Sequence, residues 1–118
     1  MIQEFILYLK ASGFDIERHP AEGYPLSIGA RWVAKALNAT ALVIYDTEEE
    51  QPEVLLWCLK ELERLGLAFH ISNLNEGEYL VVGVKRYMSR SSASGKGPTM
   101  TAAAIQAVCS LPKGAPDA

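Results

Sequence analysis

The sequence contains few of the residues from which metal centres and disulfide frameworks are built. Its 118 residues include two cysteines and two histidines. Cys58 and Cys109 each fall on the apolar face of an expected helix, where a free thiol behaves as a small hydrophobic group. The cysteines and histidines do not have the spacing of metal ligands. We therefore expect no metal and no cofactor and, because so few cysteines suit a reducing compartment, a cytoplasmic protein.

The sequence also lacks the segments that direct a chain to a membrane. No apolar run approaches the roughly 18 residues of a membrane-spanning helix, and the first four residues contain no basic region. The hydrophobic content of 49% and the small net charge of −3 argue against global disorder. This length is typical of one domain, so we expect a single α+β domain over residues 1–111 and a flexible tail over residues 112–118.

Charge is distributed unevenly along the chain. Residues 1–80 contain 13 acidic and 6 basic residues, whereas residues 81–118 contain 1 acidic and 5 basic residues. A cluster of bases with no acid among them predicts a local basic patch on an acidic protein. The patch consists of Lys85, Arg86, Arg90 and Lys96.

Helix signals occur at four places. Apolar residues recur at helical spacing near the N-terminus, and Ser27 is a suitable N-cap for a second helix. Pro52 suits the first turn of a third helix, where its missing N–H is not needed. Thr99 or Thr101 is expected to cap an alanine-rich last helix. The expected helices cover about residues 2–12, 29–39, 52–65 and 99–111.

Strand signals occur at three places. The continuous apolar run from Ala41 to Tyr45 predicts a strand covered on both faces. Two later segments alternate apolar and polar residues around a turn and predict an antiparallel hairpin, in which Gly83 marks a bulge or a close approach. Residues 88–98 are polar, small and glycine-bearing, which predicts a mobile loop. The strands, about 41–46, 67–73 and 79–86, would form the small, mixed or antiparallel central sheet of an α/β/α sandwich.

Two motifs resemble catalytic sites but lack essential parts. His70 and Ser72 form one His-x-Ser motif, whereas two-histidine phosphoesterases use a pair of them and acid–base catalysis there needs two imidazoles. The segment 94–97 is similar to the end of a phosphate-binding loop, but Pro98 interrupts the motif and removes a backbone N–H that would contact phosphate. We therefore expect no catalytic residue.

Two features are candidates for contact with a protein partner. The acidic cluster around residues 46–53 would hold a divalent ion, imitate nucleic-acid phosphate, or simply complement a helix dipole. Trp57 lies toward the charged side of its helix, so it is either a hot-spot residue or a half-buried packing residue. The candidate partner-binding residues are Trp57, Glu48, Glu49, Glu50, Lys85, Arg86, Arg90 and Lys96.

The order of elements over residues 42–111 is distinctive. A strand ending in Asp46 precedes an acidic turn, a helix that closes with Lys60-Glu61-Leu62-Glu63-Arg64-Leu65 before Gly66, a hairpin, and an alanine-rich helix after Pro98. In this order and spacing the segment resembles the phage ABA-sandwich domain family. The resemblance implies a sheet with helices on its faces and an origin in a phage or mobile element. It assigns no catalytic residue.

A second resemblance concerns the segment before the last helix. Double-stranded-RNA-binding domains also place a basic, Gly-Lys-rich segment where residues 94–97 lie. Here residues 98–101 replace the two following lysines that would contact phosphate, and phosphate contact dominates such binding. Nucleic-acid binding through the basic loop 85–96 is therefore the alternative function.

The leading expectation is a small non-enzymatic accessory protein of a phage or mobile element that acts by protein–protein binding. Inhibition of a host defence system, as anti-CRISPR proteins do, is its specific form. A protein partner is expected, nucleic acid is the alternative partner, no membrane contact is expected, and a homodimer is left open.

Overall fold

The computed structural model describes residues 2–19, 31–37, 40–47, 49–75, 77–85 and 91–111. These residues form three helices and six strands. In chain order the elements are α1 (Ile2–Ala11), β1 (Asp15–His19), β2 (Arg31–Lys35), β3 (Leu42–Tyr45), α2 (Pro52–Arg64), β4 (Leu67–Asn75), β5 (Glu78–Lys85), β6 (Ser91–Gly97) and α3 (Met100–Cys109).

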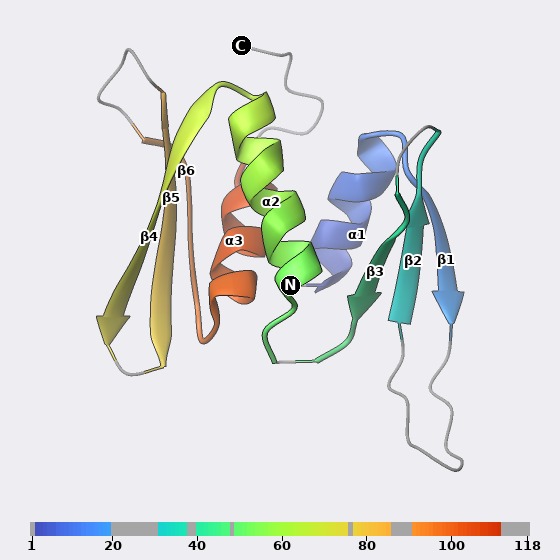
Figure 1. The fold of residues 1–118 in the computed structure, drawn as a ribbon, viewed down its shortest axis with the longest axis horizontal. Coiled ribbons are helices and arrows are strands. Elements are labelled where there is room, and N and C mark those ends of the chain that lie inside the picture. The colour runs from blue at the N-terminus through green and yellow to red at the C-terminus, as the bar shows by residue number, and fades with distance from the viewer. Residues whose placement is uncertain are drawn as a thin grey trace.

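The strands form two three-stranded antiparallel sheets with the helices between them (Figure 1). One sheet has the order β1-β2-β3 and the other β4-β5-β6. The α+β class and the layered, sandwich-like arrangement are confirmed. The order of layers differs from the expected one, because the helices form the middle layer and each sheet presents one face to them.

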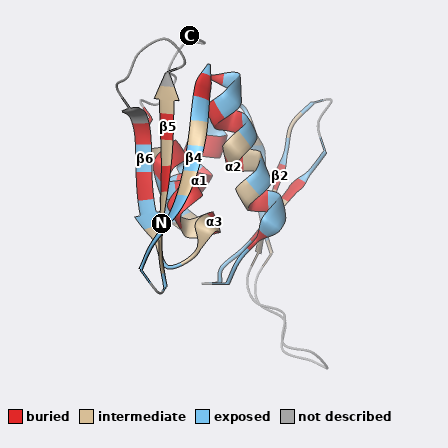
Figure 2. Cartoon of the chain, turned by 60° about the vertical axis from the view of Figure 1, so that its left-hand side comes forward, coloured by how far each residue is buried: buried red, intermediate tan, exposed pale blue. Residues whose placement is uncertain are grey.

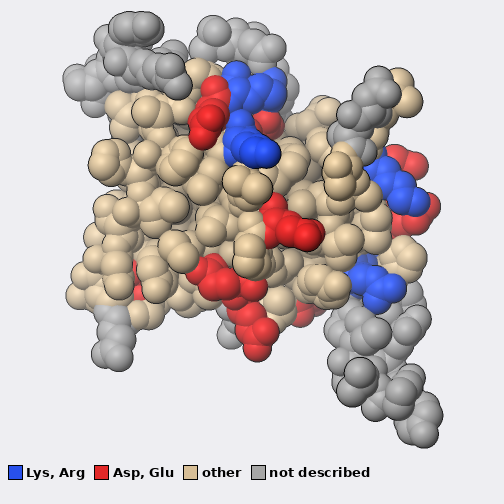
Figure 3. Space-filling model, viewed as in Figure 1, with Lys and Arg blue, Asp and Glu red and all other residues tan. Residues whose placement is uncertain are grey.

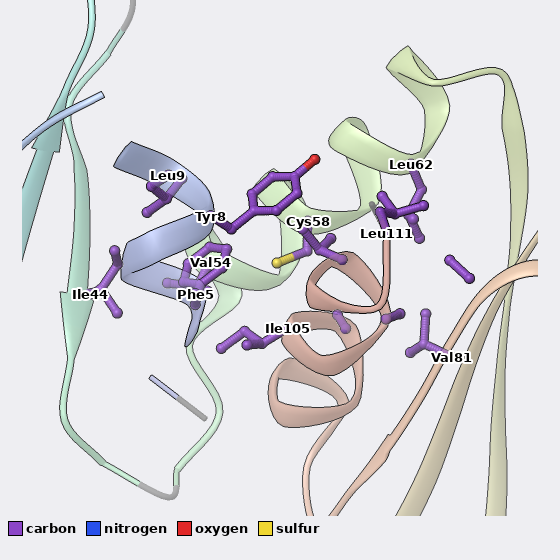
Figure 4. Packing of buried hydrophobic residues seen from close by; sticks show 14 of the residues in the cluster. Phe5, Tyr8, Leu9, Ile44, Val54, Cys58, Leu62, Val81, Ile105 and Leu111 are labelled. Carbon is purple, nitrogen blue, oxygen red and sulfur yellow. The ribbon is translucent and has the colours of Figure 1, made fainter. Parts of the chain in front are cut away.

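Buried side chains from both sheets and all three helices form one core (Figure 4). Phe5 and Leu9 of α1, Ile44 of β3, Val54 of α2 and Ile105 of α3 are fully or almost fully buried. Figure 2 shows buried residues on the helices and in bands along the strands. The core therefore connects the N-terminal sheet to the C-terminal sheet through the helical layer.

Three of the four expected helices are confirmed. Pro52 stands in the first turn of α2, as its missing N–H favours. The Thr99 hydroxyl accepts a hydrogen bond from the Ala102 N–H at 3.0 Å, so Thr99 is the N-cap of α3. The expected tail, residues 112–118, lies outside the described residues.

The helix expected over residues 29–39 is wrong where the structure describes that segment, because residues 31–35 form β2. Trp32 and Ala34 are buried on one face of the strand and Lys35 is exposed. Leu37, which lies within the expected helix, is 93% exposed. Pairing with both β1 and β3 overrides the local preference of this alanine-containing segment.

The expectation that both faces of the 41–46 strand are covered is also wrong. This segment is β3, an edge strand of its sheet. Leu42 and Ile44 are buried beneath the helices, whereas Tyr45 is 43% exposed. The sheet is an outer layer, so only one of its faces is covered.

The hairpin of β4 and β5 is confirmed. Phe69 pairs with Gly83 and Ile71 pairs with Val81. Gly83 shows both the irregular pairing and the close approach that the sequence offered as alternatives. The pairing of β5 with β6 shifts register directly after Gly83. An added Cβ there would lie 3.1 Å from Leu67 Cδ1.

The mobile loop expected over residues 88–98 is wrong for residues 91–97, which form β6; residues 88–90 lie outside the described residues. The glycines of this segment have a packing role. A Cβ on Gly95 would lie 2.3 Å from the Ala103 carbonyl oxygen and from the Ala107 nitrogen. Gly95 therefore lets β6 lie directly against the backbone of α3.

Candidate functional site

The starts of α2 and α3 meet the edge of β3 at Gln51. The Tyr45 N–H donates to Gln51 Oε1 and Gln51 Nε2 donates to the Tyr45 carbonyl oxygen, both at 2.8 Å. The Gln51 N–H donates to the hydroxyl of Thr101 at 2.9 Å. Gln51 is buried, so this one residue fixes the relative positions of the strand and the two helix N-termini.

Glu50 of the predicted acidic cluster caps α3. Its carboxylate accepts from the Thr101 N–H at 2.8 Å and from the Met100 N–H at 3.2 Å. A carboxylate at this position satisfies otherwise unpaired N–H groups and complements the positive end of the helix dipole. Glu50 therefore does complement a helix dipole, as one interpretation of the acidic cluster holds. The helix is α3 and not α2, which directly follows the cluster.

A pocket of about 480 Å³ opens beside this junction. We call it the acidic pocket. Its apolar lining comes from Ile2, Trp32 and Ile105, and its acidic lining from Asp46 and Glu49. Trp32 and Ile105 are buried whereas Asp46 and Glu49 are exposed. An apolar floor below an acidic rim suits a group with an aliphatic stem and a cationic head.

The surface near this pocket is acidic. Figure 3 shows acidic side chains gathered over the region where β3 leads into α2, with no basic side chain among them on the face drawn. Among the described residues there is no group of three or more histidine, cysteine, aspartate or glutamate side chains arranged to hold a metal ion.

Trp57 lies in a second cleft, of about 560 Å³, lined by α2 and by the end of α1. Its ring packs edge-on against those of Phe5 and Phe14, with centroids 5.6 and 5.7 Å apart, and less closely against Tyr8. Trp57 is half-buried. The packing interpretation thus explains its position, and its role as a partner-binding residue stays a prediction.

A buried polar cluster borders the same cleft. The Tyr8 hydroxyl donates to Glu61 Oε2 at 2.6 Å, and Arg64 Nε lies 2.5 Å from Glu61 Oε1. Burial, followed by the hydrogen bond to the Glu61 carboxylate, raises the pKa of Tyr8 well above its ordinary value of 10.0. The hydrogen bond from Tyr8 to Glu61 thus joins α1 to α2.

The basic candidates are described only in part. Lys96 is exposed on β6. Lys85 is the last residue of β5, and the structure describes its backbone but not its side chain. Arg86 and Arg90, together with Glu48 of the acidic cluster, lie outside the described residues. The structure therefore does not bring the four bases together as a described surface, and nucleic-acid binding remains a prediction.

The histidine motif lies at the surface, whereas Cys58 lies in the core. His70 and Ser72 are both exposed on β4. Cys58 is fully buried, and burial raises the pKa of its thiol well above the ordinary value, which disfavours the reactive thiolate. No described helix is long and apolar enough to span a membrane.

Sequence reasoning missed Gln51 and Thr101 as the residues that build the site. Their partners are distant in the sequence, since Thr101 lies 50 residues from Gln51. Trp32 was placed on a helix, so its position on a pocket floor could not be inferred.

Comparison of the chain with family models, with curated proteins and with solved structures found no match.

Proposed function

We propose that this chain is a non-enzymatic binding domain whose acidic pocket accepts a lysine or arginine side chain of a partner protein. The observation that carries the proposal is the apolar floor at Trp32 and Ile105 beneath the exposed carboxylates of Asp46 and Glu49. The floor would contact the methylene stem and the rim would pair with the charged head.

The acidic residues of the turn make different contacts, and this difference supports the proposed function. Glu50 is engaged at the start of α3, whereas no described basic side chain forms an ion pair with Asp46 or Glu49. The N–H of Glu49 donates to the hydroxyl of Thr47 at 3.2 Å, which holds the turn in shape. Two carboxylates on a shaped turn therefore face solvent above an apolar floor.

A titration with small peptides tests the site directly. The probes are Gly-Arg-Gly, blocked at both ends, and the same peptide with uncharged citrulline in place of arginine. Nuclear magnetic resonance follows the Trp32 indole and the Thr47 and Thr101 amides. We expect the arginine peptide to shift these signals and the citrulline peptide to leave them unchanged.

Charge-neutral variants give the matched comparison. Asp46→Asn with Glu49→Gln should weaken binding of the arginine peptide by roughly five- to tenfold, because each exposed pair contributes about 0.2–1 kcal/mol. Glu63→Gln removes one exposed acid from the far end of α2 and should leave binding unchanged. Equal weakening by both changes, or shifts centred away from the pocket, would contradict the proposal.

We further propose that the partner is a host protein and that the chain is an accessory protein of a phage or mobile element, in the form of a defence inhibitor. This part of the proposal is supported by the resemblance of residues 42–111 to the phage ABA-sandwich domain family. The test is phage plaquing on bacteria that carry one defined defence system. The wild-type chain should restore plaquing against at least one system, and the Asp46→Asn/Glu49→Gln chain should not.

A further inference from the structure

Among the described strands, three of the four sheet edges are protected. On β3, the Gln51 side chain occupies the outward N–H and C=O of Tyr45. On β6, the outward N–H groups bond side chains of α3: the Ser94 N–H donates to the Ser110 hydroxyl at 3.3 Å, and the Lys96 N–H donates to Gln106 Oε1 at 2.6 Å. On β1, three of the five residues are charged (Asp15, Glu17 and Arg18), and charged side chains on an edge strand are a common way to prevent strand pairing.

The remaining edge, β4, has none of these protections. It is nine residues long and contains no lysine, arginine, aspartate, glutamate or proline. In the part of the chain that the structure describes, no side chain is seen to hydrogen bond the backbone of this strand. A long uncharged edge strand of this kind is a site for pairing with another strand.

The pairing of β5 with β6 indicates which backbone groups of β5 face β4. Ser94 and Lys96 direct their N–H groups away from β5, toward α3. They stand opposite Val82 and Leu80 of β5. In an antiparallel ladder such pairs are not hydrogen-bonded to one another. Val82 and Leu80 therefore direct their N–H and C=O groups to the other side, toward β4.

The free groups of β4 follow from the same alternation. His70 and Ser72 stand opposite Val82 and Leu80, so they bond β5. Phe69, Ile71 and Asn73 alternate with them and direct their N–H and C=O groups outward. The register then shifts between Asn73 and Asn75, which limits regular pairing to residues up to about 73.

A half-exposed apolar strip lies beside this edge. Phe69 and Ile71 are half-buried on the face of β4 that is turned toward the helices, and α2 packs on this strand. On α2, Leu55 and Leu59 are half-buried one turn apart, and Leu56 next to them is 53% exposed. A strand added to β4 and a helix added beside α2 would cover this strip together.

We propose that a second copy of this chain pairs antiparallel with β4, so that the two C-terminal sheets become one six-stranded sheet with the two α2 helices side by side. A two-fold axis at Ile71 places Ile71 opposite its own copy and His70 opposite Ser72 of the other protomer. The net charge of −3 means that two copies of the chain repel one another overall. Along β4 no like charges meet, which favours self-pairing there.

Sedimentation of the wild-type chain across a concentration series, together with paired variants, tests this dimer. His70→Lys with Ser72→Lys places lysine opposite lysine twice and should raise the dimer dissociation constant about tenfold. His70→Lys with Ser72→Glu places lysine opposite glutamate and should restore the wild-type value. Because both positions are exposed, neither change is expected to unfold the monomer.

Two control experiments test whether β4 is the pairing surface and whether Ile71 lies on the two-fold axis. Thr40→Lys with Ser94→Lys adds two charges at exposed positions away from β4 and should leave the dimer unchanged. Ile71→Cys lies on the proposed axis, where the Cα atoms of a bonded pair are about 5.5 Å apart and within reach of a disulfide. This variant should form an intermolecular disulfide under oxidation, and Ser94→Cys should not.

Three results would overturn the proposal. The first is a wild-type chain that stays monomeric at millimolar concentration. The second is a dimer whose dissociation constant is the same with lysine at both positions. The third is a monomer whose β4 binds an extended segment of another protein, which would make that segment the occupant. None of these results bears on the acidic pocket, so the two proposals succeed or fail separately.

Discussion

The side-chain amide of Gln51 pairs with both backbone polar groups of Tyr45, as a residue of a neighbouring strand would. It thereby ends the N-terminal sheet at β3 without a further strand. Because the Gln51 backbone also begins α2 and bonds Thr101, the same residue sets the geometry of the acidic pocket.

Gln51→Ala tests this relationship. The change leaves the Tyr45 N–H and C=O without their partner, and we expect the free energy of unfolding to fall by about 2 kcal/mol, since each net hydrogen bond contributes about 0.5–1.5 kcal/mol. Urea denaturation measures it. Gln3→Ala, at an exposed position on α1, is the control and should change stability little. Equal effects of the two substitutions would contradict the role given to Gln51.

Glu50→Ala separates stability from binding. The carboxylate caps the first two N–H groups of α3, so its removal should lower the free energy of unfolding by about 1 kcal/mol. Affinity for the arginine peptide should stay within about twofold of wild type, since Asp46 and Glu49 supply the rim charge. A large loss of affinity without a loss of stability would assign Glu50 to the binding surface instead.

Tyr8 makes stability depend on pH in the alkaline range. Burial and the Glu61 carboxylate raise its pKa in the folded chain above 10.0, its ordinary value. Above that pH the unfolded chain has lost the phenolic proton while the folded chain keeps it. The free energy of unfolding should therefore decline as pH rises beyond about 10. In Tyr8→Phe this contribution to the decline should disappear, although the variant is less stable at neutral pH because it loses the bond to Glu61.

Alanine substitution of Gly95 tests the close packing of β6 on α3, and the same substitution of Gly83 is the comparison. Gly95→Ala places a methyl group against the backbone of Ala103 and Ala107, which cannot move aside, and should cost about 3 kcal/mol of stability. Gly83→Ala places its methyl group against the side chains of Leu67 and Leu62, not against backbone, and should cost about 1 kcal/mol. Thermal unfolding ranks the two. The reverse order would mean that β6 does not lie directly on α3.

The sequence predicted the helices whose signals are local. Pro52 fixes the start of α2 through its missing N–H, and Thr99 fixes the start of α3 through its hydroxyl. The β4–β5 hairpin was also predictable, because its alternation and its turn lie within one short segment. These features depend on neighbours a few residues away, which the sequence displays directly.

The errors concern segments whose structure depends on distant partners. Residues 31–35 have a composition compatible with a helix, and pairing with β1 and β3 makes them a strand. Residues 91–97 resemble a loop in composition, but the absence of side chains at Gly95 and Gly97 brings them against α3. In both cases contacts over long sequence separations outweigh local propensity.

By itself, the sequence determined the α+β class, the start of α2 at Pro52, an alanine-rich last helix, and the β4–β5 hairpin. Only the tertiary structure decided that the helices lie between two sheets, that Glu50 caps a helix 50 residues away, and that Trp32 forms the floor of a pocket below Asp46 and Glu49. The reason is physical. Capping and alternation act between near neighbours, whereas a pocket or a sheet edge exists only when segments distant in the sequence are packed together.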